Sequence, residues 1–163
     1  MTTLSTPTID DIRRAAERIR PHVHRTPVLR CASLDHLAGA SLFFKCENLQ
    51  KVGAFKARGA TNAVLSLSDD ETRGGVATHS SGNHAAALAR AARVRGVDAH
   101  IVMPTSAPPV KRAAVSGYGG LITPCEPTLA ARESTLAEVV ARTGATFIHP
   151  YNDPRVVAGQ GTA

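Results

Sequence analysis

The strongest constraint on the fold is a regular alternation of helical and apolar segments from about residue 54 to residue 149. The helical segments are separated by apolar runs of four or five residues. Two of the helical segments are followed by a glycine that can end a helix, Gly96 and Gly144. Short apolar strands of this kind are typical of a parallel sheet that helices cover on both faces. The pattern therefore predicts an α/β fold with an open parallel sheet. The expected helices are 55–67, 85–95, 110–117 and 129–142, and the expected strands are 75–79, 99–103, 120–123 and 146–149.

The chain on either side of this alternation carries weaker signals. Thr8 and Asp11 have the spacing of a capping box and Pro21 follows at the other end, which predicts an amphipathic surface helix. We expect a short strand at 42–46 and the start of a further helix at 156–163, where the sequence ends without a cap. The apolar face of the first helix is expected to consist of Ile9, Ile12, Ala16 and Ile19.

Composition argues against several classes of function. The net charge of +6 comes from 15 arginines and 4 lysines against 13 carboxylates, so an acidic partner is conceivable. The arginines are spread along the chain, and with two tyrosines, four phenylalanines and no tryptophan there is little to stack on bases, so no nucleic-acid partner is expected. Residues 1–25 lack the apolar region of a signal peptide, and no apolar run is long enough to cross a membrane. This predicts a cytoplasmic location and no membrane partner.

The cysteines and histidines do not form a metal-binding pattern. Cys31, Cys46 and Cys125 have no Cys-x-x-Cys spacing, so we expect buried free thiols rather than a disulfide framework or a zinc site. His79 and His84 lie five residues apart, and no carboxylate or cysteine nearby completes a ligand set. No metal site is expected in this chain.

Lys56 lies at the predicted opening of a helix, beside Phe55 and two residues before Arg58. The positive charge of Arg58, the positive end of the helix and desolvation would each lower the pKa of the lysine ammonium. A lysine with a lowered pKa can form an imine with a carbonyl compound, a role that arginine cannot take. Spacing alone leaves open the ordinary alternative, a solvated lysine in the first turn of a helix.

A run of polar residues at 78–84 joins one predicted strand to the next helix. Open α/β sheets bind ligands where a strand ends and the next helix begins. The hydroxyls, the amide and a glycine that permits close backbone approach favour an anion-binding loop. Helix capping is the alternative, although a cap needs one polar residue rather than five in succession. The candidate ligand-binding residues are Ser80, Ser81, Gly82, Asn83 and His84.

A family resemblance is carried by segments that occur in a fixed order from about residue 20 onward: 26–28, 44–47, 50–60, 80–84, 118–119, 125–127 and 149–162. Together they resemble the serine/threonine dehydratase and serine racemase family, whose members are fold type II pyridoxal-phosphate enzymes. The lysine motif and the Ser-Ser-Gly-Asn-His motif are the most specific of these segments. The chain is similar to the N-terminal half of such an enzyme.

The resemblance implies a tryptophan-synthase-β-like architecture. Residues 1–46 would form the N-terminal part of a large domain, residues 47–149 a small α/β domain, and residues 150–163 the start of the return into the large domain, truncated there. The implied cofactor is pyridoxal 5'-phosphate, with a possible divalent cation in the full-length protein. Because the phosphate-binding loop and metal ligands of the family would lie beyond residue 163, the chain alone is not expected to turn over.

The resemblance also implies how the cofactor would be held. Lys56 would bind it covalently as a Schiff base and would later remove the α-proton of the substrate. Phe55 would lie against the cofactor ring, and Asn83 would contact its phenolic oxygen.

The substrate contacts implied by the resemblance lie in the polar loop and on a later helix. The loop from Ser80 to His84 would bind the substrate carboxylate, and Arg132 matches the position of a further carboxylate contact. In racemase-like relatives Ser81 would return a proton to the opposite face of the substrate.

The function implied is an ammonia-lyase that converts L-serine, L-threonine or a related 3-hydroxy amino acid to a 2-keto acid and ammonia, as a homodimer when full length. Serine racemase is the nearest alternative, an inactive fragment or interaction domain is another class, and a cysteine or threonine synthase is a weaker one. Ala54 replaces the serine more usual in the family but occurs in hydroxyaspartate-dehydratase-like members. Ala86 replaces a glutamine that racemase relatives often carry near a nucleotide site, so nucleotide activation is not expected.

Overall fold

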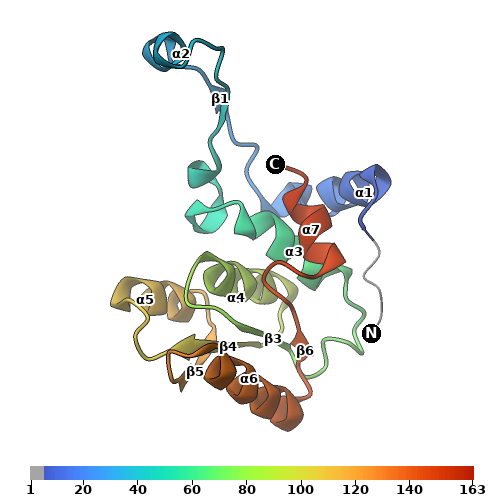
Figure 1. Ribbon diagram of the computed structural model, residues 1–163. Helices are drawn as coiled ribbons and strands as arrows, with labels where there is room; N and C mark the ends of the chain where they lie inside the picture. The colour runs from blue at the N-terminus through green and yellow to red at the C-terminus, as the bar shows by residue number, and fades with distance from the viewer. Residues whose placement is uncertain (1–5) are drawn as a thin grey trace.

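The structure is a computed structural model that describes residues 6–163, so the first five residues of the segment 1–46 lie outside the described part (Figure 1). The helices are α1 (Ile9–Ile19), α2 (Ala32–Ala38), α3 (Lys56–Ser66), α4 (Asn83–Arg95), α5 (Pro109–Gly117), α6 (Leu129–Thr143) and α7 (Pro154–Gln160), with short 3-10 turns at Arg20–His22, Glu47–Leu49 and Lys51–Gly53. The strands are β1 (Val28–Leu29), β2 (Phe44–Lys45), β3 (Val76–His79), β4 (Ala99–Pro104), β5 (Leu121–Cys125) and β6 (Thr146–Phe147).

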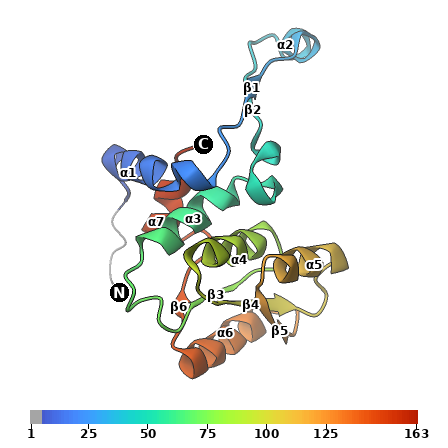
Figure 2. The same cartoon turned by 180° about the vertical axis from the view of Figure 1, so that it is seen from behind.

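The main sheet has four strands in the order β5-β4-β3-β6, and every neighbouring pair is parallel. Val76 of β3 lies opposite Ala99 of β4 on one side and Thr146 of β6 on the other. Helices α4 and α5 lie against one face of this sheet and α6 against the other (Figures 1 and 2). The predicted α/β fold, an open parallel sheet with helices on both faces, is therefore confirmed.

Each face of the sheet has its own buried cluster. Val76 and Ile101 contribute to the cluster under α3 and α4, where Leu88 of α4 is also fully buried. The next residue along β3, Ala77, belongs to the cluster under α6, together with Val139. Because successive strand residues point to opposite faces, four-residue strands such as β3 can serve both clusters, and they read as continuous apolar runs in the sequence.

Helices α3 and α7 pack against each other through two glycines. A Cβ atom on Gly159 would lie 2.7 Å from the carbonyl oxygen of Arg58 and 2.7 Å from the Cα of Gly59. A Cβ atom on Gly59 would likewise lie 2.7 Å from the carbonyl oxygen of Val156. These distances are too short for any side chain, so both positions require glycine. The glycine-rich end of the chain is thus a packing feature that holds α7 against α3.

Helix α1 carries the predicted capping box, but its buried face differs from the prediction. The buried residues are Ala15 and Ile19, whereas Ala16 is exposed and Ile9 is 60% exposed. Ala15 and Ala16 lie four and three residues before Ile19, so both spacings fit one helix face, and the structure buries Ala15. The predicted apolar face was therefore wrong at Ile9 and Ala16.

Residues 28–45 form an arm that projects from the rest of the molecule (Figures 1 and 2). Strand β1 pairs antiparallel with β2, with Val28 opposite Lys45, and all four residues of the two strands are exposed. The strand predicted at 42–46 is present only as β2, and neither β1 nor α2 was predicted. Helix α2 has no side-chain cap at Cys31, which removes the usual sequence signal for its start.

The prediction of buried thiols was correct for one cysteine of three. Cys125 at the end of β5 is buried, Cys46 is half-buried and Cys31 is exposed. Cys31 is exposed because it lies on the arm, which no other part of the described chain covers.

The last helix begins earlier than predicted. Helix α7 starts at Pro154 rather than at residue 156, because a carboxylate oxygen of Asp153 accepts a hydrogen bond of 2.8 Å from the backbone N–H of Arg155. An aspartate cap followed by proline in the first turn is a favoured helix start.

Candidate active site

Segments far apart in the sequence meet at the carboxyl end of the sheet, where α3 and α4 begin. The ammonium nitrogen of Lys56, the first residue of α3, donates a hydrogen bond of 2.7 Å to the carbonyl oxygen of Pro150, which follows β6. The ring of His79, at the end of β3, lies 6.3 Å from the ring of His149, measured between centroids. The lysine and the polar loop after β3 therefore both adjoin the segment that follows β6. This is the edge at which open α/β sheets bind ligands.

Lys56 is half-buried, and desolvation lowers the pKa of its ammonium group. Its nitrogen also lies 5.3 Å from the centroid of the Phe55 ring, in a cation–π contact. Desolvation is the cause of the shift, and the Arg58 guanidinium, which was expected to contribute, is instead paired with Glu47. A lowered pKa increases the fraction of neutral amine, the form that attacks a carbonyl carbon. The alternative of a fully solvated lysine does not describe this residue.

The turn before Lys56 holds a valine in the left-handed region of backbone space. Val52 has φ 56° and Gly53 has φ 67°. For a β-branched residue this conformation costs on the order of 1–3 kcal/mol and needs support from its surroundings. The buried side chain of Gln50 gives that support by accepting from the backbone N–H groups of His24 and Lys51 at 2.8 and 2.9 Å. The start of α3 is therefore fixed by a strained and tightly bonded turn.

A buried ion pair lies beside the same turn. Arg58 donates to both carboxylate oxygens of Glu47, at 2.8 and 2.7 Å, and Thr26 donates a third bond of 2.6 Å to that carboxylate. The bond from Arg58, supported by that from Thr26, holds the pKa of Glu47 below its usual value. Arg58 also donates to the carbonyl oxygen of Thr162 at 3.3 Å. The pair joins the base of the arm, α3 and the C-terminal residues, and sequence spacing gave no sign of it.

The polar loop between β3 and α4 is not used for helix capping. Gly82 occupies the cap position, and no side chain caps α4. Ser80 and Ser81 are half-buried, and Asn83 is exposed. A Cβ atom on Gly82 would lie 3.5 Å from the ammonium nitrogen of Lys111, so a second lysine, from α5, adjoins this loop. The capping interpretation is wrong, and Lys111 is a residue near the loop that sequence reasoning missed.

His84 is buried rather than open to the loop. The residue is 3% exposed, and neither ring nitrogen makes a hydrogen bond of good geometry within residues 6–163, although the Ile148 backbone lies close enough to favour the protonated ring slightly. Desolvation, with a further contribution from the charge of Lys56, lowers the pKa of His84 to about 4, so its ring is neutral near pH 7.

Arg132 lies half-buried in the first turn of α6, a helix that packs against β3. Desolvation is the main cause that lowers the pKa of His79, and His149 and Arg132 lower it further. The Nε atom of Arg132 is buried and has no partner among the described residues. A buried, unpaired guanidinium N–H is a donor that a carboxylate would satisfy.

His149 is a further residue near Lys56 that the sequence did not single out. Its Nδ1 atom accepts from the backbone N–H groups of Tyr151 and Asn152 at 3.3 and 2.9 Å. The neutral ring therefore carries its proton on Nε2. Desolvation lowers the pKa of His149, as it does for Lys56, so both groups lie in a partly dehydrated environment.

Residues 6–163 contain no group of three or more His, Cys, Asp or Glu side chains arranged to hold a metal ion. Over the same residues, no helix has the length and apolar character needed to cross a bilayer.

Comparisons with known proteins agree with this arrangement. The curated β-hydroxyaspartate dehydratase of Paracoccus denitrificans is 58% identical over 156 residues, which are 96% of this chain and 50% of that protein. The solved structure of maize serine racemase superimposes with a TM-score of 0.95 at 50% identity, covering 97% of this chain and 48% of that one. The solved structure of T.th. threonine deaminase superimposes with a TM-score of 0.88 at 44% identity, covering 96% of this chain and 49% of that one.

The chain thus spans about half the length of the relatives that it matches. The family described as pyridoxal-phosphate dependent enzyme matches residues 19–163, most of the chain. The fold type II resemblance and the cofactor prediction are confirmed at the level of the family. The chain belongs to the family of pyridoxal-phosphate-dependent enzymes.

Proposed function

We propose that the full-length protein is an ammonia-lyase that converts a 3-hydroxy amino acid to a 2-keto acid and ammonia. By full-length protein we mean a chain as long as the relatives, of which the 163 residues span about half. The substrate would be L-serine, L-threonine or a hydroxyaspartate. The observation that carries the proposal is the half-buried Lys56, whose lowered pKa and position at the carboxyl end of the sheet suit an amine that binds an aldehyde. A β-hydroxyaspartate dehydratase and a threonine deaminase among the relatives support this reaction class.

The residues around Lys56 fit pyridoxal phosphate. The cofactor presents an aldehyde, which needs a neutral amine, and burial of Lys56 favours that form. Phe55, 43% exposed and adjacent to the lysine nitrogen, would lie against the cofactor ring, and the exposed amide of Asn83 would contact its phenolic oxygen. When bound, pyridoxal phosphate acts as an electron sink that stabilises negative charge on the α-carbon of an amino acid.

Lys56 would also move the proton of the α-carbon. A neutral amine held in a partly dehydrated position can accept a proton at its nitrogen and later return it. The hydrogen bond to the Pro150 carbonyl shows that the lysine side chain reaches across to the segment after β6, so its nitrogen can be held in a defined place. Burial serves this step as well, because it keeps the pKa of the amine closer to neutrality.

The substrate carboxylate would bind between the polar loop and α6. The loop offers half-buried serine hydroxyls that capping does not use, and the buried Nε of Arg132 has no partner in the described part of the chain. The Lys111 ammonium beside Gly82 adds positive charge on the other side of the loop. These donors would fix the carboxylate and thereby orient the α-hydrogen toward Lys56.

Absorbance of the bound cofactor tests the assignment of Lys56. Adding pyridoxal phosphate to the full-length protein should produce a visible band, and Lys56→Ala should abolish it. Lys51→Ala, which removes a lysine from the same segment, should keep the band. An unchanged band in Lys56→Ala would overturn the assignment.

Serine racemase is the second candidate, and one observation favours it. Ser81 is half-buried next to the start of α4, and its hydroxyl makes no hydrogen bond to another described residue. A free hydroxyl at this place suits a group that returns a proton to the face opposite Lys56. The solved serine racemase structure that this chain matches is consistent with that role.

Product analysis separates the two candidates. The full-length protein should convert L-serine, L-threonine or a hydroxyaspartate mainly to a keto acid, with D-serine at most a minor product. If D-serine dominates instead, Ser81→Ala should lose it while keto acid formation persists, and Ser116→Ala, an exposed serine of α5 outside the site, is the control. Formation of neither product would overturn both candidates.

The predicted homodimer is part of the same proposal, and light scattering of the full-length protein tests it.

A further inference from the structure

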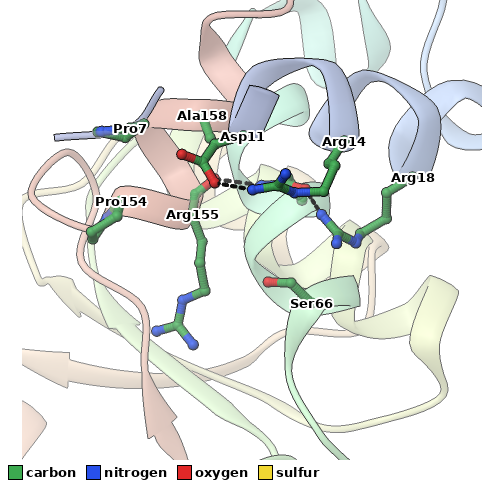
Figure 3. Close-up of a pocket in the computed structure, with 9 residues that line it drawn as sticks. Pro7, Asp11, Arg14, Arg18, Ser66, Pro154, Arg155 and Ala158 are labelled. Carbon is green, nitrogen blue, oxygen red and sulfur yellow. Dashed lines mark hydrogen bonds and ion pairs between the residues drawn. The ribbon is translucent and has the colours of Figure 1, made fainter. Parts of the chain in front are cut away.

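A polar pocket lies where α1, α3 and α7 meet, and it shares no residue with the site around Lys56 (Figure 3). Its volume is about 210 Å³. Figure 3 shows the guanidinium groups of Arg14 and Arg18 next to each other on the α1 side, while Arg155 extends from α7. The remaining lining residues are Pro7, Asp11, Asn62, Ser66, Pro154 and Ala158.

Arg18 is held in place by a neutral group. Its Nη1 atom donates a hydrogen bond of 2.6 Å to the amide oxygen of Asn62, a residue that is 3% exposed. The amide nitrogen of Asn62 in turn donates 2.7 Å to the carbonyl oxygen of Arg155, so Asn62 is fixed at both ends. Because the partner of Arg18 is an amide rather than a carboxylate, the guanidinium keeps its full positive charge while its position is fixed.

The other two arginines of the pocket are paired but keep unused donors. Arg14 donates through one nitrogen to Asp11 at 2.6 Å, and that carboxylate also accepts from the backbone and side chain of Thr8. Arg155 donates to both carboxylate oxygens of the buried Asp153, through Nε at 3.1 Å and Nη2 at 2.9 Å, and its Nη1 atom lies 3.6 Å from a carboxylate oxygen of Glu71. A guanidinium has five N–H donors, so Arg14 and Arg18, which use one nitrogen each, retain more of them for a ligand than Arg155 does. Among the three arginines that line the pocket, Arg18 is the one that forms no ion pair with a carboxylate of residues 6–163.

We infer that this pocket binds a small dianion, with the size and charge of inorganic phosphate. A fork of guanidinium N–H groups matches the oxygens of such an anion, and the volume is below that of typical pockets for drug-sized ligands or nucleotides, roughly 300 Å³ or more. Ser66 lies ten residues after Lys56 on α3, a rise of about 15 Å along the helix, so the pocket is separate from the site of the proposed function.

Calorimetric titration of the full-length protein, saturated with pyridoxal phosphate, with inorganic phosphate at constant ionic strength tests the inference. Saturating the protein first keeps phosphate from binding where the cofactor binds. The protein without substitutions should bind phosphate saturably. Arg18→Gln should weaken it by about tenfold or more, as expected for the loss of a charge-assisted contact, and Arg14→Gln should weaken it less.

The matched control is Arg13→Gln, which removes the same charge from the same helix. Arg13 pairs with Asp10 at 3.1 Å in the same i, i+3 geometry as Arg14 with Asp11, but it does not line the pocket. Phosphate binding should change by less than about twofold in this variant, since only long-range, screened electrostatics are altered. No saturable binding by the original protein, or equal weakening in Arg13→Gln and Arg18→Gln, would overturn the inference. Neither result bears on the cofactor band of Lys56, so the two proposals fail separately.

Discussion

The arm and the α/β unit (residues 56–160) contain similar short apolar strands, yet they differ in what covers those strands. Val76 of β3 and Ile101 of β4 are fully buried between layers of helices, whereas Val28 of β1 and Phe43 beside β2 are 54% and 67% exposed. A two-stranded hairpin buries little apolar surface and is marginal alone. An apolar run thus predicts a strand, while its burial depends on neighbours in space. Stability should therefore depend on contacts of the α/β unit and little on the arm.

The largest effect is expected where the two regions join, at the buried pair of Arg58 and Glu47. Arg58→Leu would leave the Glu47 carboxylate buried without its cation, which typically costs about 3–5 kcal/mol of unfolding free energy. Urea unfolding of the 163-residue chain measures this. The matched control is Arg30→Leu on the arm, whose pair with Asp35 is half exposed and should cost less than about 1 kcal/mol. Similar losses in the two variants would remove the contrast between the regions.

A pH-dependent loss of stability should follow from the buried His84. Its pKa is about 4 in the folded chain, against 6.5 for an exposed histidine, so the unfolded chain binds a proton at a higher pH than the folded chain does. The stabilisation is complete above pH 6.5 and is lost as the pH falls toward 4, by at most about 3 kcal/mol.

Urea unfolding between pH 7 and pH 4 measures this loss, with His84→Asn as the variant and His36→Asn, an exposed histidine of the arm, as the control. His84→Asn should flatten the pH dependence, and His36→Asn should not. If both variants keep the same slope, burial of His84 does not govern acid sensitivity.

The contact between α3 and α7 should tolerate no added methyl group. Gly159→Ala places a Cβ 2.7 Å from backbone atoms of Arg58 and Gly59, and such overpacking costs about 1–3 kcal/mol. Gly117→Ala is the matched control, because a Cβ there would meet nothing within 4 Å. It should change the unfolding free energy by less than about 1 kcal/mol. Equal losses of unfolding free energy in the two variants would mean that the close approach of α3 and α7 does not limit the size of the residue at position 159.

Much of the α/β unit could be predicted because its signals are local. Gly96 and Gly144 end α4 and α6 in the left-handed conformation, and the apolar runs between the helices became β3 to β6. Only β2 of the arm was predicted, because β1 and β2 pair across the intervening α2 and such pairing leaves no periodic trace in the sequence. Helix α2 also lacks a capping side chain, although Gly39 ends it as a left-handed cap.

The candidate site was predictable in its residue types but not in its electrostatics. Lys56 and the polar loop were identified from composition, position and family motifs, and the structure brings them to one edge of the sheet. The partner of Arg58 and the burial of His84 are determined by residues distant in sequence, so spacing misled on both. Lys111 adjoins the loop only because α5 packs beside α4.

The smallest effect is expected on the arm itself. Leu37 is 83% exposed, so Leu37→Ala in the 163-residue chain should change the unfolding free energy by less than about 0.5 kcal/mol. The same substitution at the fully buried Leu88 of α4 should cost about 2–5 kcal/mol, because it leaves a cavity. A loss above about 1 kcal/mol for Leu37→Ala in this chain would show that the arm packs against the α/β unit in solution. A loss confined to the full-length protein would instead show that residues outside this chain cover the arm, so the contrast between the two regions would hold for the 163 residues alone.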